Sequence, residues 1–235
     1  MNSYRIMVAD DHEIVRHGLR AILQAQPAWT VCGEAEDGRE AVAKALELKP
    51  DLVVLDIGMP NLNGLEATRQ IRALLPATKV LILSLYESEQ MVREVFEAGA
   101  AGYLLKSDAS RFLAKAAEVV RSGKVFVTPR FEQLFADGNF RPHSNKPKSP
   151  TLVTLTARER QVIQLLGEGK TTKDVAISLD MAVKTAETHR AHIMHKLDLH
   201  SITDLVMYAV RNRIVQLPQA IENIMIEQAP TTPAA

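Results

Sequence analysis

Residues 4–122 alternate between short aliphatic runs and longer segments in which apolar residues recur three and four positions apart. Continuous aliphatic runs are typical of strands buried on both faces of a parallel sheet, and the longer spacing indicates amphipathic helices. The short connections between them predict a doubly wound (flavodoxin-like) α/β domain with a five-stranded parallel sheet. The expected strands cover residues 5–9, 29–35, 52–55, 79–83 and 102–105, and the expected helices cover 13–24, 38–48, 64–75, 88–98 and 110–121.

After residue 152 the strand pattern stops and only helical periodicity remains. We expect a small all-α domain of four helices, beginning near Thr156, Thr171 or Thr172, Val183 and Ser201. Thr156 and Glu159 have the spacing of a capping box. The third helix, over about residues 183–197, has one apolar face and one polar face. A short helix, a tight turn and a polar-faced helix predict a helix-turn-helix unit, although a small helical bundle with a solvated face has the same pattern.

Residues 126–151 separate the two patterns. Most of this segment is rich in Pro, Asn, Ser and Lys and lacks periodicity, which is typical of an exposed linker. The stretch VFVTPRFEQLF, residues 125–135, which overlaps its beginning, is compatible with a short strand or one helical turn. A lid over an active site is the less favoured alternative, because residues typical of catalysis are absent from the segment. Residues 216–235 form a C-terminal tail to which we assign no role.

The composition is that of an ordinary globular protein, with 46% hydrophobic and 24% charged residues and a formal net charge of zero. The charge is unevenly divided: residues 1–125 hold 15 Lys and Arg against 17 Asp and Glu, and residues 151–215 hold nine against seven. A mildly basic second part permits binding to nucleic acid. No apolar run approaches the roughly 18 residues that span a bilayer. The single Cys32 fits a reducing compartment, so we expect a cytoplasmic protein with no membrane partner.

Polar residues follow the expected strands at their carboxyl ends, where open parallel sheets bind ligands. Asp10 and Asp11 follow the first run, Asp56 the third, and Ser84 and Lys106 the fourth and fifth. Three converging carboxylates repel one another unless a cation compensates, and Mg²⁺ suits such oxygen donors. A hydroxyl and an ammonium group at the same rim would bind phosphoryl oxygens. Taken alone, Asp56 fits equally well as a cap of the following turn.

Residues 1–125 closely resemble the receiver domain of two-component response regulators. The resemblance is carried by VADDHEIVRHGL, DLVVLDIGMPNLNGLEATRQIR, VLILSLYE and AGAAGYLLKSD. It implies that Asp56 accepts a phosphoryl group from a histidine kinase, with Lys106 and Ser84 contacting that group. The implied Mg²⁺ ligands are Asp10, Asp11, Asp56 and the backbone carbonyl of Gly58. Many receivers have a proline after the lysine, whereas this chain has Ser107.

The same resemblance implies a switch formed by Ser84 and Tyr103. When Asp56 is phosphorylated, the Ser84 hydroxyl is expected to move toward the phosphoryl group, and the Tyr103 ring is expected to rotate inward into the vacated space. The alternative is that Tyr103 is a static, half-buried aromatic side chain, since interior packing permits either arrangement.

The string LTARERQVIQLLGEGKTTKDVAISLDMAVKTAETHRAHIMHKLDLHS closely resembles the LuxR-type DNA-binding domain, over about residues 152–215. The resemblance implies that residues 183–197 enter the major groove. The side chains implied to face base edges are Glu187, Thr188 and Ala191, and those implied to contact or approach phosphates are Lys173, Lys184, Thr185, His189 and Lys196. Ala182 at the N-cap and Ala186 beneath the helix depart from the family and predict weaker affinity. A metal site at the histidines of this helix is disfavoured because they do not share one face.

Together the two resemblances predict a DNA-binding response regulator of the LuxR/NarL type. Phosphorylation of Asp56 by a sensor histidine kinase is expected to promote homodimerisation and binding to double-stranded promoter DNA. The chain is not expected to be an enzyme with a separate substrate. A hydrolase of the haloacid-dehalogenase kind would need an acid at position 58, where this chain has Gly58. A binding protein with a vestigial receiver is disfavoured by the complete set of strand-end residues.

Overall fold

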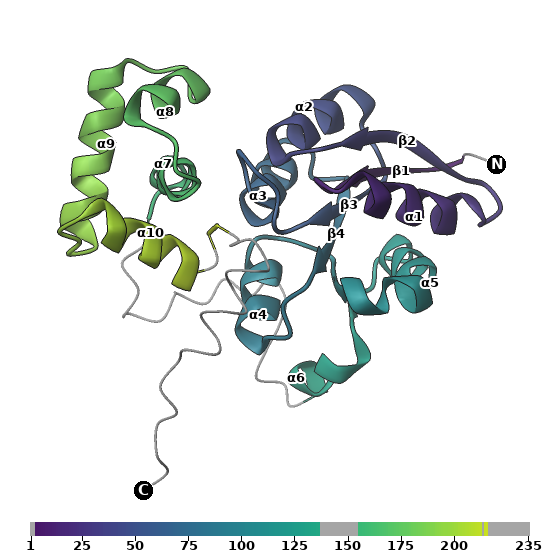
Figure 1. Cartoon of the computed structure of the whole chain (residues 1–235). Helices are drawn as coiled ribbons and strands as arrows, with labels where there is room; N and C mark the ends of the chain where they lie inside the picture. Colours follow the sequence, from purple (N-terminus) through teal and green to yellow (C-terminus); the bar gives the residue numbers. More distant parts are fainter. Residues whose placement is uncertain (1–2, 137–154, 213, 216–235) are drawn as a thin grey trace, which may run out of the picture. The chain divides into compact units, whose positions relative to one another are not determined.

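The computed structural model describes residues 3–136, 155–212 and 214–215, which fall into two compact units (Figure 1). The first unit covers Met1–Leu152 and the second Val153–Ala235. Most of the segment expected to be a linker, and the tail from residue 216 onward, lie outside the described residues.

The first unit is built on a parallel sheet with the strand order β2-β1-β3-β4-β5-β6. The strands are β1 (Tyr4–Ala9), β2 (Trp29–Ala35), β3 (Leu52–Asp56), β4 (Lys79–Ser84), β5 (Gly102–Leu105) and β6 (Phe126–Val127). The sheet therefore has six strands, and the expectation of five was wrong. The sixth consists of two buried apolar residues that pair with Gly102 and Tyr103, and a strand of two residues is too short to show periodicity in the sequence.

Helices cover both faces of the sheet (Figure 1). On one face, α1 (Glu13–Gln24) and α5 (Ala109–Arg121) bury apolar residues against β1, β3 and β4. The other face is covered by α2 (Gly38–Leu48), α3 (Gly64–Leu74) and α4 (Glu89–Glu97). Because β3 has both faces covered, all five of its residues are buried, as its unbroken aliphatic run predicted.

Three short elements complete the described part of the first unit. A 3-10 turn, η1 (Lys106–Asp108), joins β5 to α5, a second one, η2 (Pro129–Phe131), follows β6, and α6 (Gln133–Ala136) comes last. The segment expected to be a linker thus begins with a strand and two helical turns. Both alternatives given for VFVTPRFEQLF occur, one after the other.

The second unit consists of α7 (Ala157–Gly167), α8 (Thr172–Ser178), α9 (Val183–Lys196) and α10 (Ile202–Arg211) around an apolar core. Capping boxes start three of these helices, with Thr156, Thr171 and Ser201 as the N-caps. Ala182 at the start of α9 makes no side-chain cap, as its small apolar side chain predicted. Among the described residues of the whole chain, no helix is long and apolar enough to cross a membrane.

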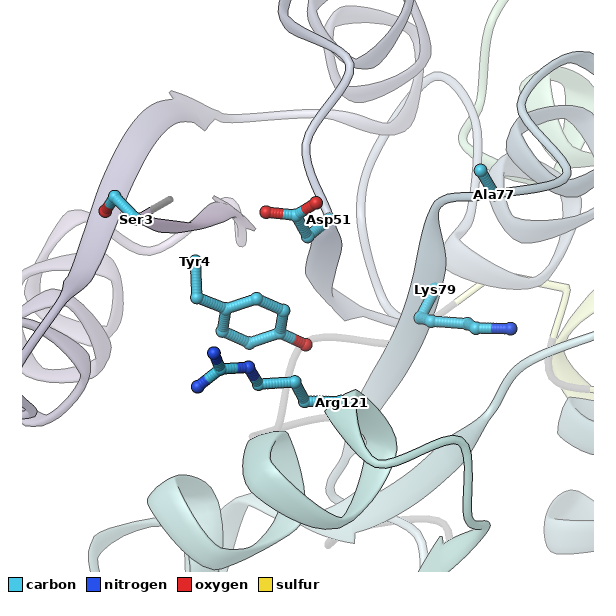
Figure 2. Close-up of a pocket in the computed structure, with 6 residues that line it drawn as sticks. All are labelled: Ser3, Tyr4, Asp51, Ala77, Lys79 and Arg121. Atoms are coloured by element: carbon cyan, nitrogen blue, oxygen red, sulfur yellow. The ribbon is translucent and has the colours of Figure 1, made fainter. Parts of the chain in front are cut away.

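A cavity of about 340 Å³ lies at the amino ends of β1, β3 and β4, at the edge of the sheet opposite to Asp56 (Figure 2). It is lined by Ser3, Tyr4, Asp51, Ala77, Lys79 and Arg121. The Tyr4 ring packs edge-on against Trp29, with ring centroids 5.5 Å apart. The Tyr4 hydroxyl is buried without a hydrogen-bond partner among the described residues. Burial, with the nearby Asp51 carboxylate, raises the pKa of Tyr4 above its ordinary value.

We predict that Tyr4→Phe leaves the free energy of unfolding unchanged or raises it by about 1 kcal/mol, because it removes a buried hydroxyl that has no partner in the part of the chain that the structure describes. Urea denaturation followed by fluorescence of Trp29, the single tryptophan, measures the change. The control is Tyr103→Phe, which removes a hydroxyl that donates to the Tyr86 carbonyl and should cost about 1 kcal/mol. A clear loss of stability in Tyr4→Phe would show that the hydroxyl has a partner.

Candidate functional site

Asp56 is the last residue of β3, and its carboxylate is nearly fully buried at the carboxyl edge of the sheet. Lys106, directly after β5, places its Nζ 3.0 Å from Asp56 Oδ1 and 2.7 Å from Asp10 Oδ2. One ammonium group therefore bridges two buried carboxylates that come from strands separated in the sequence. The strand-end residues Asp10, Asp56 and Lys106 meet, as their positions after the aliphatic runs predicted.

Burial and the neighbouring charges act in opposite directions on the pKa of Asp56. Burial raises the pKa of Asp56 to about 6, with Lys106 acting in the opposite direction and Asp10 and Asp11 adding to the rise. Burial also disfavours the charged form of Lys106, but the two carboxylates outweigh it, so the pKa of Lys106 lies above its ordinary value. At pH 7 Asp56 is thus mostly ionised and lies beside a protonated lysine.

The acidic pair at the end of β1 forms a group of possible metal ligands together with His12. His12 Nδ1 lies 2.8 Å from Asp11 Oδ1 and 3.3 Å from Asp10 Oδ1. Asp56 is not a member of this group, but Asp10 and Asp11 both act on its pKa, so three carboxylates lie at this rim and only Asp10 and Asp56 pair with Lys106. This donor set fits a hard divalent cation such as Mg²⁺.

Two glycines shape the loop after Asp56. Gly58 donates its backbone N–H to Asp56 Oδ2 at 3.2 Å. The metal contact through its carbonyl oxygen, which the resemblance implies, stays a prediction. Gly64, the first residue of α3, approaches the backbone of Asp56 so closely that an added Cβ would lie 2.1 Å from the Asp56 carbonyl oxygen. Its N–H donates to the Ile57 carbonyl at 2.8 Å. Only a glycine can close the loop in this way.

Ser84 and Tyr103, the two residues of the expected switch, are both fully buried and both bind Tyr86. Ser84 Oγ accepts the Tyr86 N–H at 2.9 Å, and the Tyr103 hydroxyl donates to the Tyr86 carbonyl. The Tyr103 ring lies edge-on to Phe131, with centroids 5.9 Å apart. Tyr103 therefore occupies the inward position and is not half-buried; its rotation stays a prediction.

In the second unit, α9 buries Ala186 and Ile193 and turns a polar face outward. All three residues expected to face base edges, Glu187, Thr188 and Ala191, are exposed. Of those expected near phosphates, Lys173, Lys184 and Thr185 are exposed, and His189 and Lys196 are partly buried. Lys184 Nζ lies 3.3 Å from Glu187 Oε2, which forms an exposed and therefore weak ion pair.

Unlike the exposed Lys173 and Lys184, Lys196 is partly buried and lies 2.7 Å from the Glu159 carboxylate of another helix, α7. Glu159 also accepts the Thr156 N–H at 2.7 Å in the capping box. Burial disfavours the charged carboxylate, but the hydrogen bonds from Lys196 and Thr156 outweigh it, and the pKa of Glu159 lies below its ordinary value. Lys196 therefore joins α9 to α7, a structural role that the expected phosphate contact did not include.

We predict that Lys196→Ala lowers the free energy of unfolding of the second unit by about 1–3 kcal/mol, because it leaves the buried Glu159 carboxylate without its cationic partner. Since the pKa of Glu159 is lowered by folding, this contribution is present above the ordinary pKa of a glutamate and is lost as the pH falls below it. Thermal unfolding at pH 7 measures the loss, with the exposed Lys173→Ala as the control. Unchanged stability in Lys196→Ala would show that Lys196 has no structural role and would leave only the expected DNA contact.

Several residues of the two sites were not predicted. His12 directly follows the acidic pair, and that adjacency in the sequence was the available signal. Arg16 is buried in α1 and donates to the Asp10 carbonyl at 2.9 Å and to Glu36 Oε1 at 2.8 Å, thereby holding the end of β1. Nothing in the sequence indicated the part played by Tyr86, because it binds Ser84 and Tyr103 through its backbone N–H and carbonyl groups.

Comparison with known proteins agrees with this geometry. Residues 6–118 match the family model of the response regulator receiver domain, and residues 153–209 match that of bacterial regulatory proteins of the luxR family. The chain belongs to the LuxR-type two-component response regulators, which are DNA-binding regulators of transcription and not enzymes.

Individual relatives share almost the whole chain. The transcriptional regulatory protein LiaR of Bacillus subtilis (strain 168) is 39% identical over 214 residues, which are 90% of this chain and 99% of LiaR. The oxygen regulatory protein NreC of Staphylococcus haemolyticus (strain JCSC1435) is 36% identical over 214 residues, with 90% and 99% covered.

Solved structures give the same result. A LuxR-family two-component response regulator from Aurantimonas sp. SI85-9A1 matches with a TM-score of 0.55 and 37% identity, covering 59% of this chain and 99% of that one. A structure of two RcsB dimers bound to two parallel DNAs matches with a TM-score of 0.54 and 25% identity, covering 88% and 98%.

Proposed function

We propose that the protein is switched by transfer of a phosphoryl group to Asp56 from a phosphohistidine of a sensor kinase. An Asp56 carboxylate oxygen attacks phosphorus, the new O–P bond forms as the N–P bond to the histidine breaks, and the histidine takes up a proton. The observation that carries this proposal is the ion triad of Asp56, Lys106 and Asp10 at the end of the sheet. Lys106 is close enough to Asp56 to stabilise negative charge on a transferred phosphoryl group.

Mg²⁺ is the proposed cofactor, and Asp10, Asp11 and Asp56 are the residues that would hold it, with Gly58 supplying a backbone carbonyl. When bound, the ion supplies positive charge that offsets the charge of the carboxylates and the phosphoryl group. Arg16 fixes the backbone of Asp10, and His12 lies against both members of the acidic pair, so these side chains orient the carboxylates.

We assign DNA reading to the exposed face of α9, by analogy with helix-turn-helix proteins, in which the second helix enters the major groove. Glu187 is exposed and can accept a hydrogen bond from a cytosine amino group, while Thr188 can contact a thymine methyl group. Lys173 of α8 and Lys184 of α9 are exposed cations suited to phosphates. A cytoplasmic location follows from contact with both the kinase and DNA.

Homodimerisation on activation is the remaining part of the proposal. The RcsB structure named above contains dimers on DNA, and a two-fold dimer of this chain would place two copies of α9 on two half-sites. In α10, Val206 and Tyr208 are only partly buried, which leaves apolar surface for a second copy. Sedimentation of the phosphorylated protein with duplex DNA tests this, and a strict monomer on the duplex would contradict it.

We predict that Glu187→Ala changes the preferred DNA sequence, whereas Lys173→Ala weakens binding to all sequences similarly and reduces the salt dependence. A base contact is worth about 1–3 kcal/mol of discrimination, while a phosphate contact carries no sequence information. Selection of duplexes from a random library, followed by affinity measurements at several salt concentrations, separates the two effects. The reverse pattern would show that the face of α9 assigned to the groove is wrong.

A further inference from the structure

The segment that follows β6 docks at the end of the sheet where β4 and β5 deliver Ser84 and Lys106. Thr128 is buried, donates its N–H to the Tyr103 carbonyl at 3.0 Å and accepts the Leu105 N–H on its Oγ1 at 3.0 Å. Phe131, held by its own N–H on the Thr128 carbonyl at 2.9 Å, packs its buried ring on Tyr103. The segment that follows β6 therefore contacts the proposed switch directly.

Arg130, between these two anchors, joins the two loops that emerge from β4 and β5. Its Nη1 lies 2.6 Å from Glu87 Oε2, and its Nη2 lies 3.9 Å from Asp108 Oδ2. Glu87 comes three residues after Ser84, and Asp108 comes two residues after Lys106. A single guanidinium group thus spans the loops that follow both residues proposed to contact the phosphoryl group.

The loop from Ser84 to Glu87 is itself a chain of contacts. Ser84 Oγ accepts the Tyr86 N–H, and the Tyr86 carbonyl accepts the Tyr103 hydroxyl. A displacement of Ser84 toward a phosphoryl group removes the first of these bonds and moves the backbone that carries Glu87. Such a movement would act on the Glu87–Arg130 ion pair, because Thr128, two residues before Arg130, is bound to β5.

We propose that Arg130 is a positioning residue that couples the loop of Ser84 and the loop of Lys106 to the segment that follows β6. This inference builds on the proposed function of Asp56 and names the residue that carries its signal onward. The ion pairs of Arg130 are poorly suited to a purely structural role. Its side chain is 45% exposed and that of Glu87 57% exposed, and exposed ion pairs contribute little to stability. A small energy is nevertheless sufficient to shift an equilibrium between two loop positions several-fold.

The test compares Arg130→Gln and Arg130→Lys with the wild-type full chain. Each protein is treated with acetyl phosphate and Mg²⁺, its phosphorylated fraction is read by intact mass, and its affinity is measured for a duplex selected from a random library by the phosphorylated wild type. The quantity compared is the gain in DNA affinity per phosphorylated molecule. Arg130→Gln should keep its thermal stability and its phosphorylation, but its gain in DNA affinity should be at least about threefold smaller than that of the wild type. Arg130→Lys should recover part of the wild-type gain.

Arg121→Gln is the matched control, because Arg121 is also 45% exposed and pairs with a glutamate, Glu118, elsewhere on the unit. Glu87→Gln should reproduce the effect of Arg130→Gln, and the double variant should be no worse than either single one, since both remove the same contact. A gain in Arg130→Gln within threefold of the wild type overturns the proposal for Arg130. If the wild type itself takes up no phosphoryl group, the proposed function of Asp56 fails instead.

Discussion

Asp56→Asn is expected to abolish phosphorylation while leaving the fold intact. The amide has nearly the same shape as the carboxylate but is not a nucleophile, so no O–P bond can form. The buried carboxylate is disfavoured by desolvation, and Asp10 remains as a partner for Lys106. The thermal stability should therefore not fall.

Intact mass after incubation with acetyl phosphate and Mg²⁺ measures this effect. Asp51→Asn is the control, because Asp51 directly precedes the same strand at its amino end, and it should be phosphorylated like the wild type. Uptake of a phosphoryl group by Asp56→Asn at the wild-type rate would show that the acceptor has been misassigned.

Gly64→Ala is expected to have the second largest effect, because it acts on the same loop through the backbone. The new methyl group would lie 2.1 Å from the Asp56 carbonyl oxygen, and neither backbone segment can yield without moving the carboxylate. We expect a loss of about 2–3 kcal/mol in the free energy of unfolding and a fall of at least about tenfold in the rate of phosphorylation, since catalytic positioning is sensitive to displacements of about 1 Å.

Gly18→Ala is the matched control for this prediction. Gly18 lies within α1, and an added Cβ there would meet no atom within 4 Å. Alanine is the better helix former, so this variant should gain about 0.5–1 kcal/mol and keep its phosphorylation rate. Equal behaviour of the two alanine variants would show that the loop after Asp56 accommodates a side chain.

The positions of Asp56 and Lys106 could be predicted because each directly follows an aliphatic run. In a parallel sheet such runs end at one edge, so residues far apart in the sequence converge without any knowledge of side-chain contacts. The limits of α1 and β2 were predicted to the residue for a similar reason, since turn residues and a change of periodicity mark both ends.

Other parts of the molecule depend on contacts that leave no periodic signal. The strand β6 has two residues and exists because Phe126 and Val127 find an edge of the sheet to pair with. Lys196 and Glu159 are 37 positions apart in the sequence, and their ion pair joins two helices. In the sequence, either residue alone has the pattern of a solvated helix face. Arg130 lies in VFVTPRFEQLF, where the sequence indicated only a short strand or one helical turn, and its place beside Glu87 is what gives it a role.

The central claim is that phosphorylation of Asp56 raises affinity for DNA. The most direct measurement is a titration of the full-length protein, with its phosphorylated fraction set by acetyl phosphate and Mg²⁺ and read by intact mass, against a duplex selected by the phosphorylated protein. We predict that affinity and dimer population rise together with the phosphorylated fraction and that neither rises in Asp56→Asn. Equal affinity of phosphorylated and untreated protein, or an equal rise in Asp56→Asn, would contradict the account.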